Sequence, residues 1–182
     1  SSIVSLEPEL VLLTVNYYDD YNFPNAQPVP TTAIYNQKAT TNAKGLATGS
    51  WVRILETGAT VQSELTTTFY DDLKYRSILS YTRNYLSGMT EVKTQYAFDG
   101  SVLLKETNHR RDSHDNAIRI LEEYDYTPQG RLLNHFHTIN SFDKELIVHN
   151  AYDELGQLIN KNVGGQDVTT YAGLQNVHYE YN

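Results

Sequence analysis

Tyr152-Asp153-Glu154-Leu155-Gly156 is the stretch that decides the fold, because an aromatic residue followed by a turn returns at regular distances along this chain. The same combination occurs at Tyr70-Asp71, at Phe98-Asp99-Gly100 and at Tyr126-Thr127-Pro128-Gln129-Gly130. The four aromatics are spaced by 28, 28 and 26 residues, and Tyr181 follows 29 residues later. A period of this size indicates one supersecondary unit that is used repeatedly.

The residues around each turn predict β-hairpins. Apolar and polar side chains alternate before the turns, which places Val92, Thr94, Tyr96 and Phe98 on one face of a strand. The same alternation groups Ile118, Ile120, Tyr124 and Tyr126, and also Leu146, Val148, Asn150 and Tyr152. Returning strands are predicted at residues 78–85, 102–107, 131–139 and 157–162, with polar connections at 87–88, 108–116 and 141–144. We expect each strand to have one apolar face and one mostly polar face.

The turn residues favour particular hairpin turns. In the segment 153–156 an Asp accepts from backbone amides and a Gly supplies the positive φ, as in a type I turn closed by a left-handed residue. Residues 127–130 predict the same turn, with Pro128 presetting φ. Residues 98–101 are two residues shorter and favour a type I′ turn. Residues 71–74 have Lys74 where the others have Gly, so we expect a looser turn or an extra residue.

The chain divides into two parts. Residues 1–50 are an irregular N-terminal part with one strand at 11–18, a Pro-rich excursion around Pro24, Pro28 and Pro30, and a polar loop at 40–45. Tyr18 lies 52 residues before Tyr70, which is two repeat steps with the middle aromatic missing. Residues 51–182 hold the regular hairpin repeats and begin with a strand at 51–55.

The predicted fold class is all-β. Consecutive hairpins whose neighbours supply the only partner for each apolar face form an antiparallel strip, here of about ten strands, that twists or curls. A short excerpt of such a strip would have two open edges. We expect the remaining repeats of a longer parent protein, or a second copy that pairs edge to edge, to cover those edges.

Composition excludes several functional classes. The net charge of −8 and the pI near 5.1 argue against nucleic-acid binding, which depends on clustered Lys and Arg. The basic spot at residues 109–111 is followed by Asp112 and Asp115 and predicts a solvated loop. The chain has no Cys, so it offers no disulfide framework, thiolate metal site or thiol nucleophile. No apolar run approaches the roughly 20 residues that span a bilayer, so no transmembrane segment is expected.

The first eight residues lack both a basic start and a continuous apolar segment, so they do not predict a secretory signal. If the parent protein is exported, we expect its signal to have been removed or to lie outside this segment. Composition alone therefore does not indicate the cellular compartment of the protein.

The turn and strand motifs resemble the YD-repeat, or rearrangement hotspot (Rhs), family. The residues that carry the resemblance are Tyr124-Asp125-Tyr126 with Gly130-Arg131-Leu132-Leu133, Tyr152-Asp153 with Gly156-Gln157-Leu158, Tyr96 and Phe98 with Gly100 and Val102-Leu103, and Tyr179-Glu180-Tyr181-Asn182. The segment 44–50 also resembles a lead-in of long repeat proteins of this kind from Bacteroidetes. The resemblance covers about residues 44–182 and, weakly, the first strand.

This resemblance implies a strip of strands that winds into a hollow shell inside a large exported or cell-surface protein. In that family the shell encloses a C-terminal toxin or another variable payload, and in animal relatives it presents an adhesion surface. The partners implied are the remaining repeats of the parent protein and a payload. The family's self-cleaving core segment contains an Asp-Pro-x-Gly element, and no Asp-Pro dipeptide occurs in this chain. Neither proteolysis nor a payload is therefore assigned to it.

Three histidines suggest a metal site. His135 and His137 are two residues apart on a predicted strand, so their rings share a face, and His149 on the next strand offers a further ligand. Leu133 and Ile139 continue the same face, which favours hydrogen-bonded imidazoles within a sheet. We predict no metal and no cofactor.

Two polar groupings suggest acid-base chemistry. His109, Asp112, His114 and Asp115 form a cluster, but no apolar residues bracket it to perturb its pKa values, so a solvent-exposed loop is expected. The pairs Asp19-Asp20 and Asp71-Asp72 suggest glycosidase carboxylates, although their positions at hairpin turns already account for the first Asp of each. No catalytic residues are predicted, and we expect the chain not to be an enzyme.

The fifteen tyrosines leave a second function open. Tyr81 and Tyr85 share a face with Leu79, while Tyr75 and Trp51 are less constrained by the pattern. Most aromatics are expected to pack between strands. The alternative is a carbohydrate-binding β-module in which exposed tyrosines contact glycans, and three or more coplanar exposed aromatics in a groove would favour it.

Overall fold

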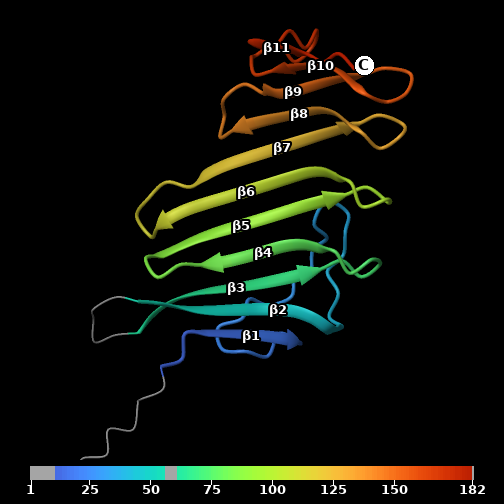
Figure 1. The fold of residues 1–182 in the computed structure, drawn as a ribbon. Coiled ribbons are helices and arrows are strands. Elements are labelled where there is room, and N and C mark those ends of the chain that lie inside the picture. The colour runs from blue at the N-terminus through green and yellow to red at the C-terminus, as the bar shows by residue number, and fades with distance from the viewer. Residues whose placement is uncertain (1–10, 56–60, 182) are drawn as a thin grey trace, which may run out of the picture.

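The computed structural model describes residues 11–55 and 61–181 and confirms an all-β strip. Within these residues, eleven strands form one antiparallel sheet in which spatial order follows chain order from β1 to β11 (Figure 1). The strands are β1 Thr14–Asp19, β2 Ala43–Ile54, β3 Gln62–Tyr70, β4 Ser77–Arg83, β5 Ser87–Tyr96, β6 Val102–Asp112, β7 Ile118–Tyr126, β8 Leu132–Ile139, β9 Glu145–Tyr152, β10 Leu158–Val163 and β11 Gln175–His178. The part of the chain that the structure describes contains no helix and therefore none able to cross a membrane.

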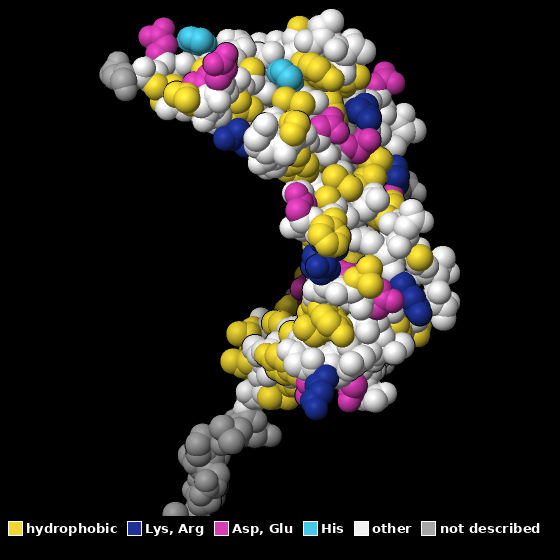
Figure 2. Space-filling view, turned by 90° about the vertical axis from the view of Figure 1, so that its right-hand side faces the viewer, with side chains coloured by type: hydrophobic (Ala, Val, Ile, Leu, Met, Phe, Trp, Pro, Cys, Tyr) yellow, Lys and Arg dark blue, Asp and Glu magenta, His cyan; other side chains and the backbone are white. Residues whose placement is uncertain are grey.

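The strip is curved. Seen along its hairpin edge it has the outline of a crescent (Figure 2), which the accumulated right-handed twist of neighbouring strands explains. The sheet does not close on itself, because β1 and β11 are its two outer strands and do not pair with each other. The predicted N-terminal segment 1–10 lies outside the described residues, and the predicted boundary at residue 50 falls within β2.

Four hairpins share one β-bulge. Where β3 passes into β4, Phe69 is opposite Leu79 and Tyr70 is opposite Ser77, so Ile78 has no partner. The hairpins β5–β6, β7–β8 and β9–β10 skip one residue in the same way, namely Leu103, Leu133 and Ile159. Two residues of the returning strand thus oppose one residue that precedes the turn, which bends the strand and increases its local twist. The tight turns after β3, β5 and β7 lie along one edge of the strip (Figure 1).

The shared bulge shows which aromatics are equivalent, and here the prediction from spacing is wrong. Tyr96, not Phe98, occupies the position of Tyr126 and Tyr152, since each of these three faces the first residue of the following strand. Phe98 lies in the turn and is 87% exposed. The predicted shorter type I′ turn is also wrong, because Ala97 N–H donates to the carbonyl of Ser101 over the same span as in the next two hairpins.

The β3–β4 turn contains the extra residue that its sequence predicts. Asp71 N–H donates to the carbonyl of Arg76, one residue further on than in the other three turns. Tyr75 takes the positive φ of 55° that Gly supplies elsewhere. The missing glycine therefore lengthens this turn without removing the left-handed position.

Several strand boundaries differ from prediction. β2 begins at Ala43, inside the predicted polar loop, because its start pairs with Asp19 of β1. β6 extends to Asp112, so residues 109–111 are strand and not loop, since they pair with the first residues of β5 and β7. Ser87 and Gly88 belong to β5 for the same reason. Pairing partners on both sides outweigh the local polarity of these segments.

The Pro-rich excursion is a strap over one face of the sheet. We define the strap as residues 20–42, between β1 and β2. Gln27 N–H donates to Thr67 Oγ1 of β3 at 3.3 Å, and Gln37 Nε2 donates to the Thr94 carbonyl of β5 at 2.8 Å. The strap covers the main buried cluster, which consists of Ile34, Ala39, Phe69, Ile78 and Leu79.

The remainder of the sheet is only partly covered. Tyr171, in the connection between β10 and β11, stacks on His149 at 4.6 Å between ring centroids and lies 6.2 Å from Phe136. Leu146 and Val148 are buried as predicted, but Ile118, Ile120, Tyr124 and Tyr126 are half-buried or exposed. The expected contrast between an apolar and a polar face therefore does not extend along the whole strip, because a cover exists only where the chain loops back.

Candidate functional site

A repeated tyrosine contact joins each hairpin to the one before it. The hydroxyls of Tyr70, Tyr96, Tyr126, Tyr152 and Tyr181 donate to the carbonyls of Ala47, Ser77, Val102, Leu132 and Leu158 at 2.7, 3.1, 2.9, 2.8 and 2.8 Å. Every acceptor precedes a residue that the pairing register skips. The bulge interrupts the regular pairing beside that carbonyl, and the tyrosine that follows, from the next strand or, for Tyr181, from just beyond β11, donates to it. We call this arrangement the tyrosine joint.

Arginines reinforce two of the joints. The guanidinium of Arg76 lies 4.9 Å from the ring centroid of Tyr96 and donates to the Ala97 carbonyl at 2.7 Å. Arg131 lies 5.8 Å from the ring centroid of Tyr152. In both cases the first residue after one turn lies against the tyrosine of the next hairpin. These contacts tie neighbouring repeats along the hairpin edge.

We expect Tyr126→Phe to lower the free energy of unfolding by about 1 kcal/mol, because it removes the hydroxyl that satisfies the Val102 carbonyl and keeps the ring. Chemical denaturation at neutral pH measures the effect. Tyr75→Phe is the matched control, since Tyr75 is 48% exposed and belongs to no joint, and it should change stability by less than about 0.5 kcal/mol. Equal effects of the two variants would contradict a stabilising role for the joint.

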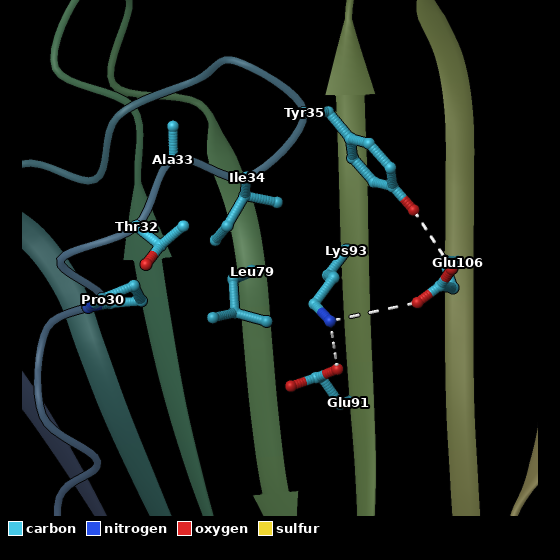
Figure 3. A pocket seen from close by; sticks show the side chains of 9 residues that line it. All are labelled: Pro30, Thr32, Ala33, Ile34, Tyr35, Leu79, Glu91, Lys93 and Glu106. Atoms are coloured by element: carbon cyan, nitrogen blue, oxygen red, sulfur yellow. Dashed lines mark hydrogen bonds and ion pairs between the residues drawn. The ribbon is translucent and has the colours of Figure 1, made fainter.

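A pocket of about 480 Å³ lies between the strap and strands β4 to β6 (Figure 3). The tip of the strap is a two-residue turn in which Ile34 and Gln37 exchange two backbone hydrogen bonds of 2.9 Å. Tyr35 and Asn36 both have positive φ, 48° and 64°, as a type I′ turn requires. The Tyr35 side chain reaches across to Glu106 and donates to its Oε2 at 3.3 Å. We call this cavity the strap pocket.

The polar wall of the strap pocket is an ion-pair network. Lys93 Nζ lies 2.7 Å from Glu91 Oε1 and 3.9 Å from Glu106 Oε1. Arg119 donates to Glu106 Oε2 through Nε at 2.9 Å and Nη2 at 2.6 Å, and Asn108 donates to Glu106 Oε1 at 2.9 Å. Two carboxylates and two cations therefore balance in charge.

These contacts decide the protonation of the wall. Burial alone would raise the pKa of Glu106, but hydrogen bonds from Arg119 and Asn108 and the nearby positive charges hold that pKa below its usual value. Burial, followed by the charge of Glu106, raises the pKa of Tyr35 to about 12. At neutral pH Glu106 is ionised and Tyr35 is neutral, so neither is poised to exchange a proton with a substrate.

The structure does not bring the three candidate histidines together. His135 stacks on Tyr124, and its Nε2 lies 3.3 Å from Glu122 Oε1 in a geometry too oblique for a hydrogen bond. His137 Nε2 is 3.0 Å from Glu145 Oε2. His149 Nδ1 is 2.7 Å from Asn134 Oδ1, beside Tyr171. Across residues 11–55 and 61–181 no group of three or more His, Cys, Asp or Glu is placed to hold a metal ion.

Two of these histidines are neutral structural groups at pH 7. Burial lowers the pKa of His135 more than the Glu122 carboxylate raises it. Burial also lowers the pKa of His149. The imidazole of His135 stacks on Tyr124, while that of His149 stacks on Tyr171 and hydrogen-bonds to Asn134.

The second histidine cluster is part of a strand end and a turn. His109 lies in β6, with Nδ1 2.8 Å from Thr90 Oγ1. Asp112 Oδ1 accepts from the backbone N–H of His114 at 2.7 Å and of Asp115 at 3.1 Å. These backbone hydrogen bonds, that of His114 foremost, lower the pKa of Asp112. His114 and Asp115 are exposed, so the predicted exposed loop is correct for the segment after Asp112.

Three of the four paired aspartates accept backbone hydrogen bonds. Asp19 Oδ1 accepts from Gly45 N–H at 2.6 Å, and Asp20 Oδ1 accepts from Asn22 N–H at 2.8 Å. Asp71 is 3% exposed and accepts from three backbone amides, whereas Asp72 is exposed. Asp20 and Asp71 thus stabilise local chain geometry, while Asp19 links β1 to β2.

The exposed aromatics lie on separate elements. Tyr81 and Leu79 share a face of β4 as predicted, and Tyr85 lies beyond the end of that strand. Trp51 lines a second groove of about 330 Å³ with Val15 and Leu65. The stacked pairs among the described residues are Tyr17–Phe23, Tyr21–Phe69, Tyr124–His135 and His149–Tyr171. None of these pairs consists of two exposed rings, and glycan binding by exposed tyrosines stays a hypothesis.

Sequence reasoning missed the strap pocket and the tyrosine joint. Charged residues at alternate positions, Glu91 with Lys93, were a signal for the polar wall, but their partners Tyr35 and Glu106 come from distant segments. The joint was visible only as a recurring tyrosine. Its acceptor is a backbone carbonyl, which leaves no signal in the sequence.

No family model matches the chain, and a search of curated proteins finds no match.

Proposed function

We propose that this chain is a non-catalytic structural and interaction module of a large exported or cell-surface protein of the YD-repeat type. Its hairpins would form part of a β-shell that encloses or presents a variable C-terminal payload. The observation that carries the proposal is the tyrosine joint, which recurs from Tyr70 to Tyr181 with the same donor and the same kind of acceptor. Because each repeat contacts its neighbour through the same joint, further repeats can be added without a new kind of interface.

The geometry of the strip supports this proposal further. The sheet is curved and open, so additional hairpins on either outer strand would continue its curvature. The carboxylates of Asp19, Asp20, Asp71 and Asp112 accept backbone hydrogen bonds, and Glu106 pairs with Arg119. Carboxylates that accept hydrogen bonds or form ion pairs stabilise a structural wall, whereas a general acid requires a pKa shifted toward the operating pH.

The parent gene and its product test the proposal. We expect further Tyr-led hairpins, an export signal and a hypervariable tail in the open reading frame. Electron microscopy of the purified full-length product should show a hollow particle. An open reading frame that ends near residue 182, or a full-length product without an internal cavity, would contradict the shell.

A further inference from the structure

The strap pocket has two unlike walls. Pro30, Ile34 and Leu79 form an apolar wall on the side of the strap and β4, while Glu91, Lys93 and Glu106 form a polar wall on β5 and β6 (Figure 3). Its volume of about 480 Å³ lies within the range of small-molecule sites, roughly 300–1,000 Å³. A ligand that fits both walls must itself have one apolar and one hydrogen-bonding side.

The charge balance of the pocket selects against ions. Lys93 lies between Glu91 and Glu106, and Arg119 holds the far side of Glu106. An anion would approach two carboxylates, and a cation would compete with Lys93 for them. Either would leave a charge imperfectly paired in a partly buried site, which is costly. The favoured ligand is therefore neutral.

Unused hydrogen-bonding capacity remains on the polar wall. Glu91 Oε1 is contacted by Lys93 and by Asn108, while Oε2 of Glu91 accepts no hydrogen bond from the residues that the structure describes. Lys93 carries three donors, and its close contact is the one with Glu91. A donor and an acceptor thus stand side by side, as vicinal hydroxyl groups require.

The strap tip holds the pocket open in advance. Tyr35 has a φ of 48°, which is unusual for an aromatic residue, and its hydroxyl is fixed on Glu106. Gln37 adds a second anchor, because it donates to the Thr94 carbonyl and accepts from Tyr96 N–H at 3.1 Å. A preformed cavity loses less conformational entropy on binding.

We propose that the strap pocket binds a neutral hexopyranose, with the C–H face of the sugar on Pro30 and Leu79 and vicinal hydroxyls on Lys93 and Glu91. This site is separate from the exposed tyrosines and does not depend on the shell function. Lys93 donates to a sugar oxygen, and Glu91 accepts from the neighbouring hydroxyl. Tyr35 closes the end of the pocket through Glu106.

Titration of the whole chain with neutral methyl glycosides tests the site. The probes are methyl glucopyranoside, galactopyranoside, mannopyranoside and N-acetylglucosaminide, followed by amide chemical shifts in NMR. We expect saturable shifts for at least one probe, concentrated at residues 30–35, 91–93 and 106. Lys93→Met, which removes the ammonium and keeps most of the stem, should weaken binding about tenfold or more, because it removes a hydrogen bond donated by a charged group.

A variant that fills the pocket provides a second, independent test. Thr32→Trp places a large side chain in the cavity and should abolish binding without removing a member of the ion-pair network. Tyr75→Ala, outside the pocket, is the control and should leave binding unchanged. The proposal is overturned if no neutral probe saturates, if binding survives both pocket variants, if Tyr75→Ala removes it, or if inorganic phosphate or ammonium produces the same shifts.

Discussion

Phe69→Ala is expected to lower the free energy of unfolding by about 3–5 kcal/mol, the range for deleting a buried aromatic side chain. Phe69 is 1% exposed and stacks on Tyr21 with 4.9 Å between ring centroids. Its ring joins the strap to β3 within the main buried cluster, together with Ile34 and Leu79. The cavity left by alanine would remove contacts from both layers at once. Thermal unfolding should show a Tm lower by about 6–20 °C.

Phe98→Ala is the matched control for this substitution. Spacing predicts that Phe98 is equivalent to Tyr126, yet Phe98 is 87% exposed and its described contact is with the ammonium of Lys74, 4.6 Å from the ring centroid. An exposed cation–π contact contributes about 0.5–1 kcal/mol, so the loss should stay below about 1 kcal/mol. Comparable losses from both variants would contradict the register of the β5–β6 hairpin, which places Phe98 in the exposed turn.

Asp71→Ala should destabilise the fold by about 3 kcal/mol, because it leaves buried donors without an acceptor. Asp71 accepts from the backbone N–H groups of Leu73, Lys74 and Arg76 at 2.9, 2.5 and 3.0 Å, and from Arg76 Nε at 3.2 Å. No glycine occurs in this turn, so its conformation depends on the hydrogen bonds to the Asp71 carboxylate. Chemical denaturation at pH 7 measures the loss. A change below about 1 kcal/mol would show that water replaces the carboxylate.

The same group predicts a pH dependence. Burial alone would raise the pKa of Asp71, but the hydrogen bonds from Lys74, Arg76 and Leu73 hold it below its ordinary value of 3.8. Because the pKa in the folded chain lies below that in the unfolded chain, ionised Asp71 stabilises the fold above about pH 4. That contribution is lost as the pH falls through the folded-state pKa.

Asp71→Asn separates this effect from general acid unfolding. The variant keeps the shape of the side chain and removes its titration, so its stability should fall less steeply than that of the wild type below about pH 4. Asp72→Asn is the control, since Asp72 is exposed, and it should follow the wild-type curve. Identical slopes for wild type and Asp71→Asn would mean that other carboxylates account for the acid sensitivity.

Local patterns predicted the hairpins because their causes are local. Alternation with a period of two and Asp or Gly at turns act over a few residues, which is why β7, β8, β9 and β10 were placed within a few residues of their observed bounds. The turn at residues 71–76 was anticipated as longer for the same reason. Polar strands such as the end of β6 were missed, since pairing with β5 and β7 and not composition makes them strands.

The error at Phe98 has a specific origin. Spacing treats Tyr96 and Phe98 almost equally, because both are aromatics near an Asp-Gly turn. What distinguishes them is the bulge at Leu103 and the hydrogen bond from the Tyr96 hydroxyl to Ser77, which join different strands. No period read along one chain contains that information.

The amino-acid order of this chain was enough to establish repeated antiparallel hairpins, the position of most turns and the existence of an excursion near its prolines. Those features follow from φ preferences and from side-chain alternation, both of which act between near neighbours. The position at which the strap packs on the sheet depends on tertiary contacts, since Tyr35 hydrogen-bonds to Glu106, 71 residues further along the chain. The strap pocket, the burial of Phe69 and the acceptors of the tyrosine joints arise in the same way. Each depends on which distant backbone and side-chain groups the twisted sheet brings within contact distance.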